Sequence, residues 1–155
     1  MSQNPLNLVD QVLIDRLSTI TPANGYFTDI GTRIHTKWIG ALLDVEDLAY
    51  PCITIQPDEC PPALAGAGVW QFHLGRKVIG LAKPDHPDDC LAQLNDIAAD
   101  LARCLHVQEG MPNPWGQSGP RKVVLKSISQ FQPDHEVPVG TVSIPVQLHV
   151  VLPGE

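Results

Sequence analysis

The closest grouping of potentially reactive side chains lies between Asp85 and Cys90, where the sequence reads Asp-His-Pro-Asp-Asp-Cys. Zinc takes thiolates, imidazoles and carboxylates as ligands, and His86 and Cys90 are four residues apart, as on one helix face. Pro87, however, predicts that His86 precedes the helix. Capping carboxylates and a half-buried Cys90 explain the cluster without a metal. We therefore expect no metal site, and a small enzyme centred on His86 and Cys90 is a less favoured alternative.

Patterns for other kinds of catalysis give no stronger candidate. The serine nucleophile of an α/β-hydrolase needs a G-x-S-x-G turn between a strand and a helix, whereas Ser118 lies in a stretch of glycine and proline. The glycine spacing matches neither a phosphate-binding loop nor a dinucleotide-binding fingerprint. The histidines occur singly along the chain. We predict that the protein has no catalytic residues, binds no cofactor and is not an enzyme.

The charge balance argues against tight binding to nucleic acids. The formal net charge is −7, and the acids concentrate in residues 43–61 and 85–109. Affinity for a phosphate backbone depends on Lys and Arg, whose closest groupings here are doublets such as Arg121-Lys122. Aromatic residues that could stack on bases make up only 5% of the chain, too few to suggest a stacking surface. We expect no sequence-specific contact with DNA or RNA.

The sequence carries no signal for a membrane or for export. No window reaches the roughly 18 continuous apolar residues of a membrane span. The N-terminal residues Met1 to Pro5 have neither the charged nor the apolar region of a secretory signal. We therefore expect a cytoplasmic protein in which the four irregularly spaced cysteines are reduced thiols: Cys52, Cys60, Cys90 and Cys104.

The N-terminal part of the chain predicts one amphipathic helix. Apolar residues recur at helical spacing over residues 6–20, with polar residues between them. The run from Thr21 to Gly25 combines proline, asparagine and glycine, which end a helix. A short strand is expected within residues 32–38.

Strands are expected in the middle of the chain. Residues 52–56 alternate in polarity between two prolines, which predicts a strand with Ile53 and Ile55 facing the core. A further strand is expected over residues 69–83, with a turn at residues 73–75.

The second helix is the clearest element in the sequence. Pro87 opens it, and Asp88 and Asp89 place carboxylates at the positive end of the helix dipole. Its predicted apolar stripe consists of Leu91, Leu94, Ile97, Ala98, Leu101, Cys104 and Leu105. Its predicted solvent-exposed face consists of Gln93, Asp96, Asp100 and Arg103.

Two strands are expected near the C-terminus. Residues 122–131 are rich in β-branched side chains, and residues 141–152 alternate between apolar and polar. Pro145 cannot donate a sheet hydrogen bond, which predicts that the last strand lies at an edge or a bulge. The apolar side of that strand carries Val142, Ile144, Val146, Leu148 and Val150.

Together these elements predict one α+β domain over residues 1–155. The polar side of the last strand indicates helices on one face only, so we expect a small mixed or antiparallel sheet with two main helices packed on that face. Three segments are expected to be irregular because of their proline and glycine content or their length: 57–68, 107–120 and 132–140.

Three segments resemble the tail terminator (tail completion) proteins of long-tailed bacteriophages. The first is GYFTDIG at residues 25–31, which follows a helix ending in RLSTI at residues 16–20. The second is YPCITI at residues 50–55, a strand before an acidic turn. The third is the leucine-rich second helix, which ends near Leu105. The segment 107–120 departs from the family pattern.

The resemblance implies a structural role without catalysis. Members of the family share a small mixed sheet flanked by helices and assemble as hexameric rings. The ring caps the tail tube, ends its polymerisation and provides the surface to which the DNA-filled head attaches. The implied partners are further copies of the chain, the tube protein below and the connector protein above, and genomic DNA passes through without sequence-specific binding. The implied location is the virion tail or neck, assembled in the bacterial host cytoplasm.

Charged loops between strands are the candidate axial contacts of such a ring. Regular elements suit contacts between subunits, because they hold the subunit angle, and the separate acidic and basic regions could meet head to tail. Strand-joining loops suit contacts along the tail. We therefore predict axial contacts through Asp58, Glu59, Asp134 and Glu136, acting mainly on encounter rate and specificity. A head completion or tube protein, which would stack on a different ring, is an alternative.

Overall fold

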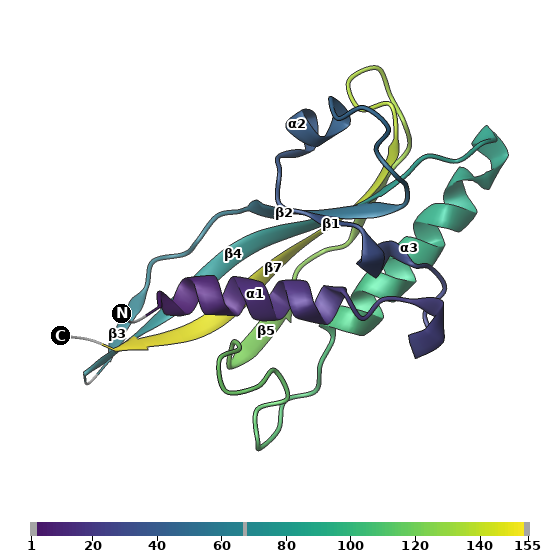
Figure 1. Ribbon diagram of the computed structural model, residues 1–155. Coiled ribbons are helices and arrows are strands. Elements are labelled where there is room, and N and C mark those ends of the chain that lie inside the picture. Colours follow the sequence, from purple (N-terminus) through teal and green to yellow (C-terminus); the bar gives the residue numbers. More distant parts are fainter. Residues whose placement is uncertain (1–2, 67, 154–155) are drawn as a thin grey trace.

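The computed structural model describes residues 3–66 and 68–153 of the chain. The strands of this described part form one seven-stranded sheet in the order β1-β2-β4-β7-β5, with β3 paired to β4 and β6 paired to β7 (Figure 1). β1 is parallel to β2 and the other pairs are antiparallel, so the sheet is mixed. The strands are β1 (Ile34–His35), β2 (Cys52–Pro57), β3 (Leu64–Gly66), β4 (Val69–Ala82), β5 (Lys122–Leu125), β6 (Ser129–Phe131) and β7 (Gly140–Pro153).

Strands β4 and β7 form the central pair and run the length of the molecule (Figure 1). They pair from Val69 opposite Pro153 to Ala82 opposite Gly140. Every second side chain of β7 from Val142 to Val150 is buried, and the residues between them are only partly buried. The predicted two-sided alternation of the last strand is confirmed, and its apolar side packs in the main core. We call this side of the sheet the inner face and the opposite side the outer face.

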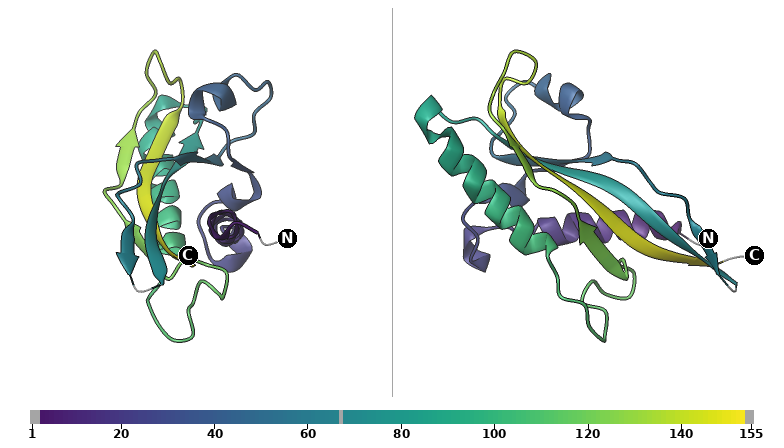
Figure 2. Two further views of the ribbon diagram at one scale, coloured as in Figure 1. Left: turned by 90° about the vertical axis from the view of Figure 1, so that its left-hand side faces the viewer. Right: turned by 180° about the vertical axis from the view of Figure 1, so that it is seen from behind.

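Helices α1 (Pro5–Leu17) and α3 (Cys90–Leu105) pack on the inner face (Figures 1 and 2). The Asn4 side chain caps α1 by accepting a hydrogen bond from the N–H of Leu6 at 2.9 Å. The Arg76 guanidinium ties the sheet to α1, because it donates to both oxygens of the Asp10 carboxylate at 2.8 and 2.9 Å. The predicted α+β class, with two main helices on one face, is confirmed.

The outer face is covered at one end, which corrects the expectation of helices on one face only. The short helix α2 (Ile39–Leu43) packs there in a second apolar cluster. Thr54 Oγ1 donates to the carbonyl of Lys37, and Gln56 Oε1 accepts from the N–H of Ile39 at 2.6 Å, so both polar side chains are satisfied although buried. The buried members of the cluster are Leu42, Cys52, Ile79, Leu81 and Val139.

Two predictions between residues 57 and 83 need correction. The segment 57–68 is not irregular throughout, because β3 lies within it and pairs with the start of β4. The predicted turn at 73–75 does not form, and Gly75 remains paired with Gln147 in a continuous β4. Glycine at position 75 allows the backbone of Glu59 to lie close to β4, since a Cβ on residue 75 would collide with that backbone. The chain after β2 therefore passes directly over Gly75.

The predicted strand 122–131 is two short strands, β5 and β6, both paired with β7. Pro145 of β7 lies opposite the interruption, where its carbonyl accepts from the N–H of Lys126 at 2.8 Å. The prediction of an edge or a bulge at this proline is wrong about the edge, because β7 lies between β4 and the β5–β6 row. The bulge is confirmed, because the pairing register shifts by one residue between Leu125 opposite Val146 and Ser129 opposite Ser143. The N–H and C=O of one residue point to the same side of a strand, so the missing donor of Pro145 faces the interrupted row.

The segment 107–120 is irregular and packs through one aromatic residue. Trp115 is buried in the main core, with the guanidinium carbon of Arg16 lying 5.9 Å from its ring centroid. Asn113 braces the segment, since its side chain accepts from the N–H of Trp115 at 3.0 Å and donates to the carbonyl of Pro120 at 2.9 Å. This segment has no regular secondary structure, and it is held by internal hydrogen bonds and by the buried side chain of Trp115.

Candidate functional site

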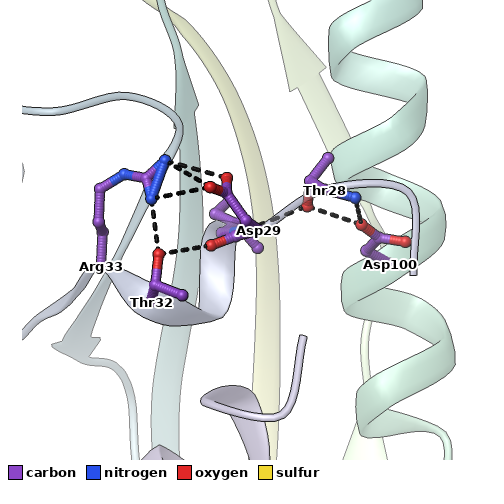
Figure 3. A network of polar contacts seen from close by, with 6 residues as sticks. Thr28, Asp29, Thr32, Arg33 and Asp100 are labelled. Atoms are coloured by element: carbon purple, nitrogen blue, oxygen red, sulfur yellow. Dashed lines mark hydrogen bonds and ion pairs between the residues drawn. The ribbon is translucent and has the colours of Figure 1, made fainter. Parts of the chain in front are cut away.

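The loop between α1 and β1 is fastened to α3 by one carboxylate (Figure 3). Asp100 accepts hydrogen bonds from the N–H of Phe27 at 2.9 Å, the N–H of Thr28 at 2.8 Å and the Thr28 hydroxyl at 2.7 Å. Only 1% of Asp100 is exposed. Three donors compensate the carboxylate for its lost hydration, and the carboxylate in turn satisfies two backbone N–H groups. We call residues 25–33 the clasp.

Two glycines and an arginine shape the clasp. Gly25 has a φ of +88°, a left-handed conformation that favours glycine, and Arg103 of α3 donates to its carbonyl at 2.7 Å. The Arg103 guanidinium also lies over the Tyr26 ring, 4.6 Å from the centroid. At Gly31 a Cβ would lie 2.5 Å from the carbonyl oxygen of Leu17, so glycine allows the clasp to pack on the end of α1.

The other end of the clasp is tied to the sheet. Nη2 of Arg33 lies 2.9 and 3.1 Å from the two carboxylate oxygens of Asp29, and Nη1 donates to the Thr32 hydroxyl at 2.6 Å (Figure 3). The Arg33 carbonyl accepts from the N–H of Ile53 in β2 at 2.9 Å. The clasp is therefore held between α3 on one side and the β1–β2 edge of the sheet on the other.

The clasp presents an aromatic side chain beside a hollow in the surface. Phe27 is 71% exposed although its backbone is fixed by Asp100. The adjoining hollow has a volume of about 540 Å³. Tyr50 lines it, burial raises the pKa of the Tyr50 phenol, and the Lys83 ammonium lies 6.0 Å from the centroid of its ring. Three carboxylates also line what we call the acidic hollow: Asp29, Asp85 and Asp96.

The prediction that Asp100 lies on the solvent-exposed face of the second helix is wrong. Asp100 is buried because the clasp folds over that side of α3. Its spacing, three residues after Ile97 and four before Cys104, is the signal that could have placed it at the margin of the apolar stripe. The opposite error concerns Leu91, which was assigned to the stripe but is 58% exposed. Leu91 lies one turn before Asn95, whose side chain faces the sheet edge at Gln130 of β6.

The alternative site at His86 and Cys90 is not brought together. Cys90 is buried beside Gly140 and Leu94, whereas His86 is exposed before the turn η3 (Pro87–Asp89). The four cysteines are free, and burial raises the pKa of Cys52 to about 11 and also raises that of Cys104, so both of these thiols are protonated at neutral pH. Within residues 3–66 and 68–153, no group of three His, Cys, Asp or Glu residues could hold a metal ion.

The structure separates the four predicted axial residues into two pairs. Asp58 and Glu59 lie beside Gly75 of β4, where the N–H of Asp58 donates to the Gly75 carbonyl at 3.1 Å. Asp134 and Glu136 lie in the loop before β7, which ends where Gly140 pairs with Ala82. Gly75 and Ala82 are roughly 20 Å apart along β4, at about 3.3 Å per residue. The two acidic pairs therefore lie at different levels along the sheet.

A scan against protein-family models found no match, and a search of the curated proteins found none either. Across the described part of the chain, no helix has both the length and the apolar character needed to span a bilayer. Three features of the protein bear on its function: the clasp, the acidic hollow and the distribution of surface charge.

Proposed function

We propose that this protein is a structural assembly protein that forms a ring on the tail tube of a long-tailed bacteriophage, as tail terminators do. The clasp carries the proposal. It contains residues 25–31, the first segment that resembles the family, and it displays Phe27 on a backbone fixed by Asp100. An exposed aromatic group on a fixed backbone loses little conformational entropy on binding, which suits it to anchor a contact with another protein.

The arrangement of the acidic loops supports contacts at more than one height of such a ring. A terminator needs one set of contacts to the tube and another to the connector above. The pair Asp58 and Glu59 and the pair Asp134 and Glu136 lie at different levels along the sheet, so each is free to contact a different partner. In this proposal the ring ends tube polymerisation, offers the head-attachment surface and lets genomic DNA pass without sequence-specific contact.

The proposal is tested by the mass of the purified protein and by electron microscopy with and without tail tubes. We expect closed rings, hexameric as the family resemblance implies, and tubes that stop growing at a defined length with a ring at one end. A chain that stays monomeric at high concentration and in the presence of tubes, while the tubes grow without limit, would contradict the proposal.

A further inference from the structure

We propose that neighbouring copies in the ring join through two separate surfaces, the acidic hollow of one copy and a basic edge of the next. The basic edge is the outermost row of the sheet, residues 121–131, which comprises β5, β6 and the residues that flank and link them. This inference rests on the proposed ring and names the contact that would close it.

The basic edge combines positive charge with exposed apolar side chains. Residues 110–133 contain three bases and no acid. The bases are Arg121, Lys122 and Lys126, all exposed, and the large apolar side chains of Ile128 and Phe131 are also exposed. Glu109 reaches the edge and pairs with Lys122 at 3.3 Å, whereas Arg121 and Lys126 form no ion pair with the described residues. Lysines on an edge strand also discourage uncontrolled pairing, but that role does not require exposed Ile128 and Phe131.

The acidic hollow has the complementary composition. Residues 84–102 contain five acids and neither Lys nor Arg, and Lys83 is the one Lys or Arg among the described residues that lines the hollow. Asp100 is buried and accepts hydrogen bonds from the clasp, and the other four are exposed. Asp85 and Asp96 line the hollow, and Phe27 and Tyr50 supply apolar surface beside them. Opposite charges would steer and orient the two surfaces, while burial of the aromatic and aliphatic side chains would supply most of the affinity.

The positions of the two surfaces allow one copy to use both at once. The basic edge pairs with β7 at one side of the sheet, whereas the acidic hollow lies at one end of the sheet, where Tyr50 precedes β2, Lys83 follows β4 and Asp96 lines it from α3. Each copy can therefore offer its hollow to one neighbour and its edge to the next. Contact between two different surfaces is heterologous, and its repetition gives a ring when the rotation between copies closes.

Charge reversal on either surface tests the inference. We expect the edge variant (Lys122→Glu with Lys126→Glu) and the hollow variant (Asp85→Lys with Asp96→Lys) to keep the thermal melt of the wild type but to lose the rings, both alone and on tail tubes. A control matched to the edge variant, Lys37→Glu with Lys77→Glu, changes the net charge by the same amount outside both surfaces and should form rings. Added sodium chloride should weaken wild-type assembly, because the charges are exposed.

Mixing the two variants identifies the contact itself. The intact hollow of the edge variant fits the intact edge of the hollow variant, and the reversed edge fits the reversed hollow, so the mixture has two compatible contacts. Native mass spectrometry should therefore show rings in which the two variants alternate, although neither variant forms rings alone. A single chain with all four substitutions should recover rings, because both surfaces change sign together.

The outcomes separate this inference from the proposed function. Wild-type rings together with rings from both reversed variants would overturn the contact and leave the ring proposal intact. A wild type that stays monomeric on tubes would overturn both. If the edge variant forms normal rings but no longer retains a short DNA duplex that the wild type binds, the basic edge is a nucleic-acid contact and the inference fails.

Discussion

Asp96 and Asp100 lie one turn apart on α3 and carry the same side chain, yet their surroundings differ. Asp96 lines the acidic hollow and is exposed, whereas Asp100 is buried under the clasp. The hydrogen bonds of Asp100 stabilise the folded protein, because the N–H groups of Phe27 and Thr28 would otherwise be left without an acceptor. A single carboxylate thus links α3 to the segment that displays Phe27.

We expect Asp100→Ala to lower the free energy of unfolding by about 2 kcal/mol, since it leaves two part-buried N–H groups without their acceptor. The control, Asp96→Ala, should change it by about 0.5 kcal/mol or less, because the side chain is exposed. Urea denaturation of the two variants beside the wild type measures the difference. Small and equal effects would mean that the clasp holds without its carboxylate.

His149 lies on the outer face, stacked on His73 with ring centroids 4.1 Å apart. Burial lowers its pKa below the ordinary 6.5, and His73 and Lys122 lower the pKa further, while Glu109 opposes them. Its Nε2 is buried and has no hydrogen-bond partner among the described residues. A base with a lowered folded pKa binds fewer protons when folded than when unfolded. Its contribution to stability is therefore present above pH 6.5 and is lost as the pH falls toward the folded pKa.

We expect the melting temperature of the wild type to fall as the pH is lowered below 6.5, and to fall less for His149→Gln, which cannot take up the proton. His135→Gln removes an exposed histidine and should keep the wild-type pH dependence. Thermal melts over a pH series provide the measurement. A fall of the same size in His149→Gln would assign the effect to other groups.

At the scale of elements, α3 serves the core and the surface at once. Leu94, Ile97 and Leu101 are buried, while the same helix supplies Asp96 to the acidic hollow. Leu91 lies at the margin beside β6 and is mostly exposed. The buried residues therefore hold α3 on the sheet, and its exposed residues remain available for contact with another protein.

Leu101→Ala should lower the free energy of unfolding by about 2–5 kcal/mol, because it removes a fully buried side chain. Leu91→Ala deletes the same atoms at an exposed position and should cost about 1 kcal/mol or less. Denaturant melts of both variants measure the contrast. Equal costs would show that the stripe of α3 has been assigned with the wrong phase.

At the scale of the whole molecule, the proposed ring needs contacts between copies and contacts along the tail. In the further inference, the acidic hollow and the basic edge supply the first kind. The loops that carry Asp58 with Glu59 and Asp134 with Glu136 are the candidates for the second, and both pairs lie outside the acidic hollow and the basic edge. The two kinds of contact should therefore respond to different substitutions.

Reversing Asp58, Glu59, Asp134 and Glu136 to Lys should leave the fold and the ring intact but reduce the capping of tail tubes. Exposed charges act mainly on encounter rate and specificity, so rings should form while docking slows. Electron microscopy of tubes assembled with the variant should show overlong tubes or tails without heads. Normal termination by the quadruple variant would show that these loops are not the axial contacts.

Elements whose pattern is local could be predicted from the amino-acid sequence. The stripe of α3, the alternation of β7 and the inward direction of Ile53 and Ile55 follow from the fixed periods of helix and strand, and the structure confirms them apart from Leu91 and Asp100. The resemblance at residues 25–31 identified the clasp as a segment of interest, although it did not predict its hydrogen bonds.

Groups that are covered by distant parts of the chain could not be identified from local sequence patterns. Asp100 is buried by residues more than seventy positions earlier, and Thr54 and Gln56 are satisfied by the segment that leads into α2. Pro145 is tolerated in an interior strand because the interruption between β5 and β6 falls opposite it. A local period predicts which side of an element is apolar. It does not predict what packs over the polar side, because that depends on strand order and on loops closing over long separations.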